Sequence, residues 1–241
     1  MMTARHSATF DRLFRLYNRR LLKRHFAAVR VAGLEIARSL DRRLPVICFG
    51  NHSCWWDGLI EYYIARELLD VEIFLMMEER QLQRYRFFRY LGAFSVNRDS
   101  AREAYASVQY AASVCHRPGS WLWIYPQGVM RPNDARPLHF ERGAAVVAER
   151  TGTTVQMLPF AHRYEFLAEQ RPEAFTLFGK PLIVDQPIDT RALTQQMENV
   201  ATELLDTLRL QIASGQTQFY PVTLSGALST NVRYDRFRGR A

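Results

Sequence analysis

Short apolar runs alternate with helical segments along most of this chain of 241 residues, and this alternation constrains the fold more than any other feature. Each run is bounded by polar or turn-forming residues, as buried strands are. Because strands that are joined by helices pair in parallel, the pattern predicts one α/β domain with a largely parallel sheet flanked by helices. The expected strands cover residues 29–33, 45–50, 72–77, 93–96, 121–125 and 155–161, and a bent or paired strand covers 175–178 and 182–184.

The segments between these strands carry the signals of helices. Their apolar residues recur at helical spacing, Ser100 is followed by Glu103 as in a capping box, and Asp189 precedes the last helix. The expected helices cover residues 58–69, 79–91, 100–114 and 142–150, and a long one follows 189. We expect the α/β domain to span residues 34–225, between an N-terminal amphipathic helical segment at 1–33 and a basic tail at 226–241.

The charge and the cysteine content indicate which kinds of partner the protein binds and which redox compartment it occupies. The formal net charge of +8 favours an anionic surface or a polyanion as a partner. Cys48, Cys54 and Cys115 are an odd number without C-x-x-C spacing, which argues against a disulfide framework and favours a reducing compartment. No apolar run approaches the roughly 18 residues of a spanning helix, and the N-terminus lacks a secretory signal. Five histidines lack metal-ligand spacing, so we predict no metal site at His6, His25, His116, His139 and His162.

Nearly all of the net charge lies in residues 5–30, which hold eight Lys and Arg residues against one acid, Asp11. Apolar residues recur there at helical spacing: Phe10, Leu13, Phe14, Leu16, Tyr17, Leu21, Leu22 and Phe26. A basic amphipathic helix of this kind is typical of an anchor on an anionic membrane surface. An ordinary surface helix that packs on its own domain fits the same pattern. Nucleic acid is disfavoured as a partner, because no aromatic platform or groove-reading module accompanies the charge.

A polar pair, Asn51-His52, follows the buried run at residues 45–48, near a strand end where a rigid scaffold presents side chains to a substrate. Asp57 comes five residues after His52. On one continuous helix the two side chains would lie roughly 140° apart. They therefore touch only if His52 precedes the helix and Asp57 lies in its first turn. In that geometry Asp57 accepts a hydrogen bond from one imidazole nitrogen and leaves the other as a general base.

The pattern Asn-His-x4-Asp resembles the signature of the glycerolipid acyltransferases, the family of lysophosphatidic acid acyltransferase. Three later stretches resemble the other motifs of this family, in the same order. Residues 92–98 resemble its Gly–Phe–Arg block, residues 125–128 (Tyr-Pro-Gln-Gly) its Phe-Pro-Glu-Gly-Thr-Arg motif, and residues 158–160 (Leu-Pro-Phe) its apolar-Pro-apolar strand end. The resemblance covers residues 45–185, and four motifs in one order are much more specific than any one of them.

This resemblance implies transfer of a fatty acyl group from a thioester of acyl-carrier protein or coenzyme A to a hydroxyl of a lipid acceptor, without a cofactor. It makes residues 34–225 an acyltransferase domain, His52 the general base and Asp57 the residue that orients it. Backbone N–H groups near Asn51–Ser53 or Gly128 are expected to stabilise the oxyanion. The enzyme is expected to be peripheral, on the cytoplasmic face of a membrane. The residues implied in substrate binding are Asn51, Phe94, Arg98, Tyr125, Pro126, Gln127, Gly128, Arg131 and Pro159.

Two departures of the third motif from the family pattern bear on the acceptor. Gln127 stands where the family has Glu, and Met130 stands where it has Arg, with Arg131 one residue late. In the family the Glu binds the acceptor's glycerol hydroxyl and the Arg binds its phosphate. Gln127 still forms hydrogen bonds with a hydroxyl but carries no charge. A lysophospholipid, a sugar hydroxyl on a glycolipid and a glycosylated isoprenoid therefore all remain open as acceptors.

Three other functions fit parts of the sequence. Cys54 could act as a nucleophile with His52 as its base, although residues two apart on one loop seldom align for this chemistry. A relative that binds lipid without turnover would keep the fold and the altered third motif. A thioester hydrolase would use the same His52–Asp57 pair to activate water.

Overall fold

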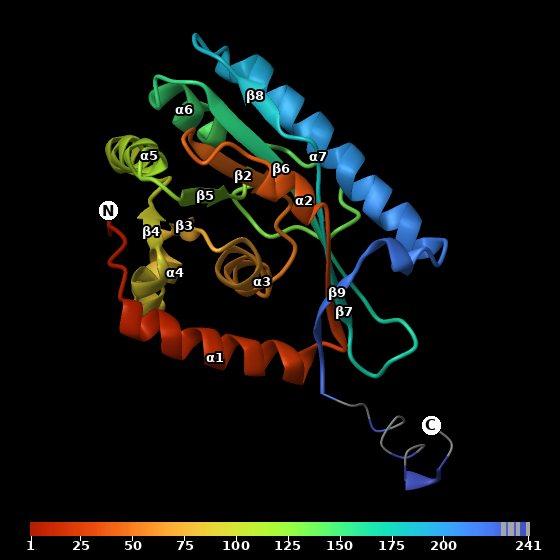
Figure 1. The fold of residues 1–241 in the computed structure, drawn as a ribbon. Coiled ribbons are helices and arrows are strands. Elements are labelled where there is room, and N and C mark those ends of the chain that lie inside the picture. Colours follow the sequence, from red (N-terminus) through yellow and green to blue (C-terminus); the bar gives the residue numbers. More distant parts are fainter. Residues whose placement is uncertain (228–229, 231–233, 235–236, 240–241) are drawn as a thin grey trace.

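The structure, a computed structural model, describes every residue except 228–229, 231–233, 235–236 and 240–241, and nine strands in this part of the chain form one sheet (Figure 1). The strand order is β4-β3-β5-β2-β6-β7-β1-β9. The remaining strand, β8, lies outside this order and pairs with β6. The five neighbouring strands β4, β3, β5, β2 and β6 run parallel to one another, which confirms the predicted α/β class. In contrast, β7 and β8 each pair antiparallel with β6, and β9 pairs antiparallel with β1. The strands are β1 (Ala28–Ala32), β2 (Val46–Gly50), β3 (Glu72–Glu78), β4 (Ala93–Val96), β5 (Ser120–Ile124), β6 (Val155–Glu165), β7 (Glu173–Phe178), β8 (Leu182–Val184) and β9 (Val222–Ser225).

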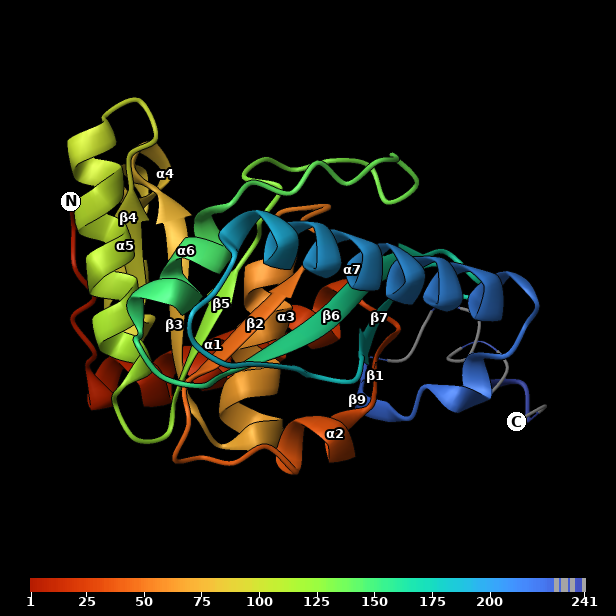
Figure 2. The ribbon, with the colours of Figure 1, turned by 90° about the horizontal axis from the view of Figure 1, so that it is seen from above.

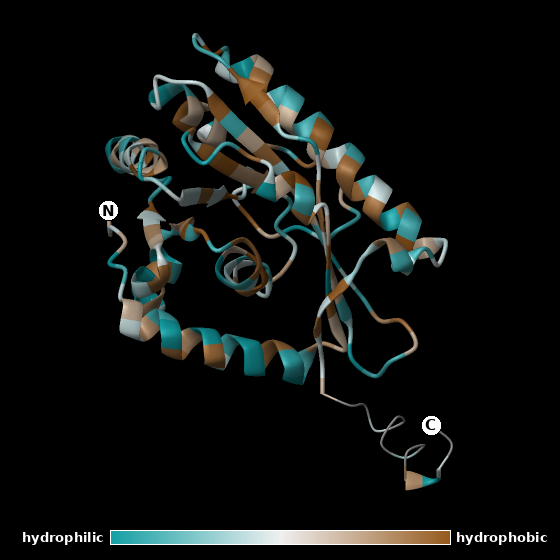
Figure 3. Ribbon diagram, viewed as in Figure 1, coloured by the Kyte–Doolittle hydropathy of each residue, from teal (hydrophilic) through white to brown (hydrophobic). Residues whose placement is uncertain are grey.

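Helices cover both faces of this sheet (Figure 2). Side chains alternate along β2, so that Val46 and Cys48 enter one core cluster with α2 and α3, and Ile47 and Phe49 enter another with α5, α6 and α7. Figure 3 shows hydrophobic residues concentrated in the strands and hydrophilic residues along much of α1. The helices are α1 (Ala8–His25), α2 (Leu34–Arg38), α3 (Asp57–Tyr63), α4 (Glu79–Arg84), α5 (Ala101–Cys115), α6 (Gly143–Arg150) and α7 (Thr190–Ala213).

Some elements differ from the sequence prediction because contacts with distant residues reshape them. The helix predicted over 79–91 is α4 followed by a 3-10 segment, Arg86–Leu91, in which Phe87 and Phe88 pack against Phe14 of α1. The turn predicted after β1 contains the short helix α2. The unpredicted strand β9 pairs antiparallel with β1 and covers that edge of the sheet. The bent or paired strand predicted at 175–178 and 182–184 consists of two strands, β7 and β8, which both pair with β6 rather than with each other.

The N-terminal segment of residues 1–33 packs on the domain and also contributes β1 to the sheet. Asn18 of α1 is buried and donates a hydrogen bond to Leu59 O on α3 (3.0 Å), and the ring of Phe14 packs edge-on against Tyr62. Other apolar side chains of the helix point outward, with exposed fractions of 57–64%: Leu13, Leu16 and Tyr17. The apolar stripe is therefore divided between the domain and the solvent.

Two further predictions concern the membrane and the C-terminal tail. Within the described residues, none of the helices combines the length and the apolar character that crossing a bilayer requires. Most of the predicted basic tail, residues 226–241, lies outside the described residues. Its first two residues are described, and the N–H groups of Gly226 and Ala227 donate to Ala27 O and Lys23 O, both at 2.8 Å.

Candidate active site

The carboxyl ends of β2 and β5 meet the first turn of α3 at one edge of the sheet. His52 follows β2, Gln127 follows β5, and Asp57 is the first residue of α3. Hydrogen bonds join the two strand-end loops, since His52 N donates to Gln127 Oε1 (2.6 Å) and Arg131 N donates to His52 O (2.8 Å). The first and third motifs thus form one site.

His52 and Asp57 adopt the geometry that their spacing predicts. His52 Nδ1 lies 2.7 Å from Asp57 Oδ2. The Asp57 side chain is fully buried, whereas that of His52 is 19% exposed. Because a carboxylate only accepts hydrogen bonds, the proton of a neutral His52 lies on Nδ1, and Nε2 keeps the lone pair of a general base.

Asp57 is held by more groups than His52 alone. Its Oδ2 also accepts from the backbone N–H groups of Ser53 (2.7 Å) and Cys54 (3.0 Å), and its Oδ1 accepts from the hydroxyl of Tyr164 (2.6 Å). Burial by itself raises the pKa of Asp57, but the hydrogen bond from His52 and the charges of His162 and His52 outweigh it, so that the net pKa is lowered. Asp57 is therefore an ionised carboxylate with a fixed orientation.

Tyr125 and Tyr164 complete the surroundings of this pair. The Tyr125 ring stacks on the His52 ring, with centroids 4.1 Å apart and an interplanar angle of 15°. Tyr125 was predicted at the site, but Tyr164 was not. Tyr164 lies 107 residues after Asp57, and no spacing in the sequence connects the two.

Asn51 and Gln127, both predicted to bind substrate, are buried and bound to main-chain groups. Asn51 Nδ2 donates to His162 O (2.9 Å), and Asn51 Oδ1 accepts from His162 N (2.8 Å). Gln127 accepts from His52 N and donates to Leu138 O (3.3 Å). In the structure these two amides hold the loops around His52 in place.

The predicted cationic residues lie beside the third-motif loop. A β-carbon added at Gly128 would stand only 2.3 Å from Arg98 Nη1, and Gly128 has a φ of +66°, so both space and backbone conformation favour glycine there. The backbone of Arg131 is fixed to His52 O. Its side-chain Nε is buried and has no hydrogen-bond partner among the described residues. Arg98 and Arg131 thus flank the loop that contacts His52.

Phe94, Pro126 and Pro159 are buried parts of the scaffold. Phe94 is enclosed in the core with its ring edge-on to Tyr110. Pro159 lies within β6 opposite Phe49, and Pro126 O accepts from Glu141 N (2.8 Å). These residues shape the strand ends from within.

The backbone donors expected at the oxyanion site already have partners in the structure. His52 N donates to Gln127, Ser53 N donates to Asp57, and Gly128 N donates to Tyr125 O (3.0 Å). This expectation is therefore not supported at His52, Ser53 and Gly128, because each N–H is used to shape a loop.

Cys54 has the environment of a protonated thiol. Burial and the charge of Asp57 raise its pKa to about 12, and its Sγ lies 3.5 Å from Asp57 Oδ1. A nucleophilic cysteine needs a lowered pKa and a base. In this structure Nδ1 of His52 is bonded to Asp57 instead, so the geometry disfavours Cys54 as the nucleophile.

Glu61 and His162 form a second buried pair behind the first. His162 Nε2 lies 3.6 Å from Glu61 Oε1, and the side chains are 1% and 0% exposed. Burial raises the pKa of Glu61 more than the interactions with His162 lower it. The only signal in the sequence is that Glu61 lies four residues after Asp57, which places both on one face of α3.

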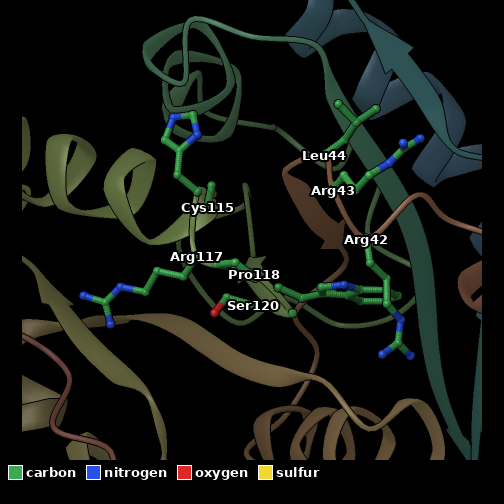
Figure 4. A pocket seen from close by; sticks show the side chains of 10 residues that line it. Arg42, Arg43, Leu44, Cys115, Arg117, Pro118 and Ser120 are labelled. Atoms are coloured by element: carbon green, nitrogen blue, oxygen red, sulfur yellow. The ribbon is translucent and has the colours of Figure 1, made fainter.

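A separate pocket of about 290 Å³ lies at the other end of the strands, where β2 and β5 begin (Figure 4). Its lining includes four cationic or imidazole side chains: Arg42, Arg43, His116 and Arg117. None of the predicted site residues lines it. Within the described residues, no group of three or more His, Cys, Asp or Glu side chains is arranged to hold a metal ion.

Comparisons with known proteins identify the family of the chain and a protein that shares its fold. Residues 28–163, more than half of the chain and including all four motifs, match the family described as Acyltransferase. No curated protein sequence matches the chain significantly. Among solved structures, the 1-acyl-sn-glycerophosphate (LPA) acyltransferase PlsC from Thermotoga maritima shares the fold, with a TM-score of 0.57 and 15% identity over 83% of this chain and 79% of that one. The chain therefore belongs to the acyltransferase family and is an O-acyltransferase.

Proposed function

We propose that this enzyme transfers a fatty acyl group from a thioester of acyl-carrier protein or coenzyme A to a hydroxyl of a lysophospholipid or a related lipid or glycolipid. One observation carries the proposal: in a chain of the acyltransferase family, a buried Asp57 is bonded to Nδ1 of His52 and leaves Nε2 as a base at the partly open strand end.

In this mechanism His52 Nε2 removes the hydroxyl proton as the hydroxyl oxygen attacks the thioester carbonyl carbon. Collapse of the tetrahedral intermediate breaks the carbon–sulfur bond, and the imidazolium returns the proton to the leaving thiolate. The products are an acyl ester and a free thiol, and His52 is neutral again. Asp57 stabilises the imidazolium between the two steps and keeps the ring oriented. No covalent acyl-enzyme forms.

Arg98 and Arg131 are the groups that we propose for negative charge on the acceptor or the oxyanion. Arg98 lies against Gly128, and the Arg131 Nε has no hydrogen-bond partner among the described residues. A guanidinium forms paired hydrogen bonds with phosphate or carboxylate oxygens. Met130, which is exposed, contributes apolar surface at the position where the family motif has Arg.

The proposed partner of residues 5–30 is an anionic membrane surface, on its cytoplasmic face. The outward side of α1 combines the apolar residues Leu13, Leu16 and Tyr17 with the exposed cations Arg20 and Arg24. Each Lys or Arg near an anionic surface contributes roughly 1 kcal/mol of binding free energy. This side would hold the enzyme as a peripheral protein where its lipid acceptors lie.

The test is acyl transfer by the purified enzyme, with labelled acyl-coenzyme A or acyl-carrier protein and a panel of acceptors. The panel contains lysophosphatidic acid, a neutral lysolipid and a glycolipid. We expect an acyl ester whose formation requires both the acceptor and His52. Free fatty acid without ester would indicate a hydrolase, and acceptor binding without any product would indicate a lipid-binding relative; either result contradicts the proposal.

A further inference from the structure

Glu61 and His162 form a buried carboxylate–imidazole pair, the same combination of groups as Asp57 and His52. Glu61 lies on α3 one turn after Asp57, and His162 lies on β6. His162 Nε2 faces Glu61 Oε1 at 3.6 Å, while its Nδ1 lies 3.0 Å from Thr176 Oγ1 on β7. Because both side chains are at most 1% exposed, the second pair does not reach an acceptor or a thioester.

A purely structural role explains this pair poorly. Asp57 and Glu61 are both fully buried, and carboxylates one helical turn apart repel each other when both are ionised. A buried ion pair also loses its hydration, and replacement of such a pair by apolar residues of similar volume is often neutral or stabilising. By this general rule, an apolar contact between α3 and β6 would serve stability at least as well as the pair does.

Tyr125 contacts His52 and carries a buried hydroxyl without a hydrogen-bond partner in the described part of the chain. The ring of Tyr125 stacks on the His52 ring. The Tyr125 hydroxyl and both carboxylate oxygens of Glu61 are buried and have no hydrogen-bond partner among the described residues. Burial and the negative charge of Glu61 raise the pKa of this hydroxyl, so it stays protonated and is able to donate to a carboxylate. The motif that residues 125–128 resemble usually has Phe at this position, so the hydroxyl is a departure of this chain.

His162 contacts the same loop through its main chain. Its N–H and carbonyl form two hydrogen bonds with the side chain of Asn51, the residue before His52. His162 thus contacts the loop of His52 through Asn51.

We propose that Glu61 and His162 are positioning residues for His52, and that the Tyr125 hydroxyl links them to its ring. The inference rests on the proposed acyl transfer and adds a second set of residues to it. In this proposal the Tyr125 hydroxyl, which has no hydrogen-bond partner among the described residues, donates to the equally unpartnered carboxylate of Glu61, which His162 faces at 3.6 Å. This bond holds the Tyr125 ring against one face of the imidazole. This contact keeps Nδ1 on Asp57 and Nε2 directed at the acceptor hydroxyl, as a general base requires.

The experiment compares kcat and KM of the full-length enzyme with those of three variants. Tyr125→Phe and Glu61→Leu each remove the link, and we expect kcat to fall about tenfold while KM changes by less than about twofold, since only the alignment of the base is lost. Glu61→Gln keeps an oxygen that accepts from Tyr125 and is expected to retain most of kcat. Tyr63→Phe is the control, because it removes another tyrosine hydrogen bond of α3, to Thr223 O on the distant strand β9 (2.9 Å).

The double variant with Tyr125→Phe and Glu61→Leu separates positioning from a general loss of stability. If the two residues form one link, the double variant loses no more than the larger single loss. Losses that multiply, a wild-type kcat in Tyr125→Phe, or an equal fall in Tyr63→Phe would overturn the inference. A wild-type enzyme that forms no acyl ester with any acceptor would overturn the proposed function instead.

Nitrogen NMR of the histidine rings gives a readout that needs no turnover. The ring shifts of His52 report which nitrogen carries the proton. We expect Tyr125→Phe and Glu61→Leu to reduce the population with the proton on Nδ1, and Tyr63→Phe to leave it unchanged. A His52 signal that is identical in wild type and Tyr125→Phe would overturn the inference even if no acceptor had been found.

Discussion

At the scale of single residues, the proposed reaction depends on His52 and Asp57. We expect His52→Ala to lower kcat by about 10²- to 10⁴-fold, the range for a lost general base, while the fold is kept because the ring is partly exposed. Asp57→Asn should act in the same direction, because an amide does not fix the Nδ1 proton of His52. Steady-state kinetics with circular dichroism measures both effects.

Cys54→Ser is the matched control for these two variants. Its thiol is held protonated by burial and by the charge of Asp57, so a serine there should retain most of the activity. An inactive Cys54→Ser together with an active His52→Ala would establish the cysteine mechanism and refute the general-base mechanism.

Residue 130 bears on the choice of acceptor. Met130 replaces a guanidinium that would bind phosphate, so we expect lysophosphatidic acid not to be the best acceptor, and Met130→Arg to raise its kcat/KM about tenfold relative to a neutral lysolipid. Position 127 is a poor place for the same experiment. A carboxylate there would bring an oxygen against Leu138 O, to which Gln127 now donates.

The measurement is kcat/KM for lysophosphatidic acid and for a neutral lysolipid or glycolipid, in wild type and Met130→Arg. Val129→Arg, at the neighbouring exposed position, controls for added charge alone. A wild-type preference for lysophosphatidic acid of about tenfold, or 1.4 kcal/mol, would show that this interpretation of the third motif is wrong.

At the scale of elements, α1 joins the domain to the proposed membrane surface. A deletion of residues 1–30 would also remove most of β1 and the buried Asn18, so substitutions on the outward side are the better test. We expect Leu13→Gln with Leu16→Gln, or Arg20→Glu with Arg24→Glu, to weaken binding to anionic vesicles by about tenfold or more, since cationic and apolar contacts both contribute.

Co-sedimentation with anionic vesicles measures this binding at several salt concentrations. The binding should weaken as salt rises, because exposed charges are screened beyond about 8 Å at physiological ionic strength. Leu210→Gln on α7 removes an equally exposed leucine from another helix and serves as the control. Equal binding by the α1 variants and the control would contradict the anchor.

At the scale of the whole molecule, the buried acids make stability depend on pH. Burial raises the pKa of Glu61 in the folded state, so the folded protein binds this proton more tightly than the unfolded chain does. The carboxyl therefore reduces stability as the pH rises above its ordinary pKa of 4.5, and the reduction disappears below that pH. We expect Glu61→Gln to be more stable than wild type near neutral pH and to lose this advantage in acid.

Thermal denaturation of wild type and Glu61→Gln, followed from about pH 4 to pH 8, measures the difference. Glu35→Gln on α2 changes an exposed carboxyl and should shift the melting temperature equally at every pH. A Glu61→Gln protein that is less stable than wild type near pH 7 would show that the ionised carboxylate stabilises the fold.

Much of the fold was predictable because its signals are local. Strand runs, helical spacing and the caps at Ser100 and Asp189 each depend on residues within one or two turns, and the caps lie where they were predicted. Elements that depend on distant partners were not predictable. The aromatic segment after α4 turns toward α1, and β9 forms only because the edge of β1 is available to it.

The sequence by itself determined the α/β class, the family and the His52–Asp57 pair, because motif order and a five-residue spacing are properties of a contiguous chain. Only the tertiary structure decided what the other polar residues do. Gln127 reaches the His52 backbone across 75 residues, Asn51 reaches His162 across 111, and Tyr164 reaches Asp57 across 107. No periodicity in the sequence links such partners. Parallel strands are joined by crossover connections, and the length of a crossover does not determine which side chains meet at the strand ends.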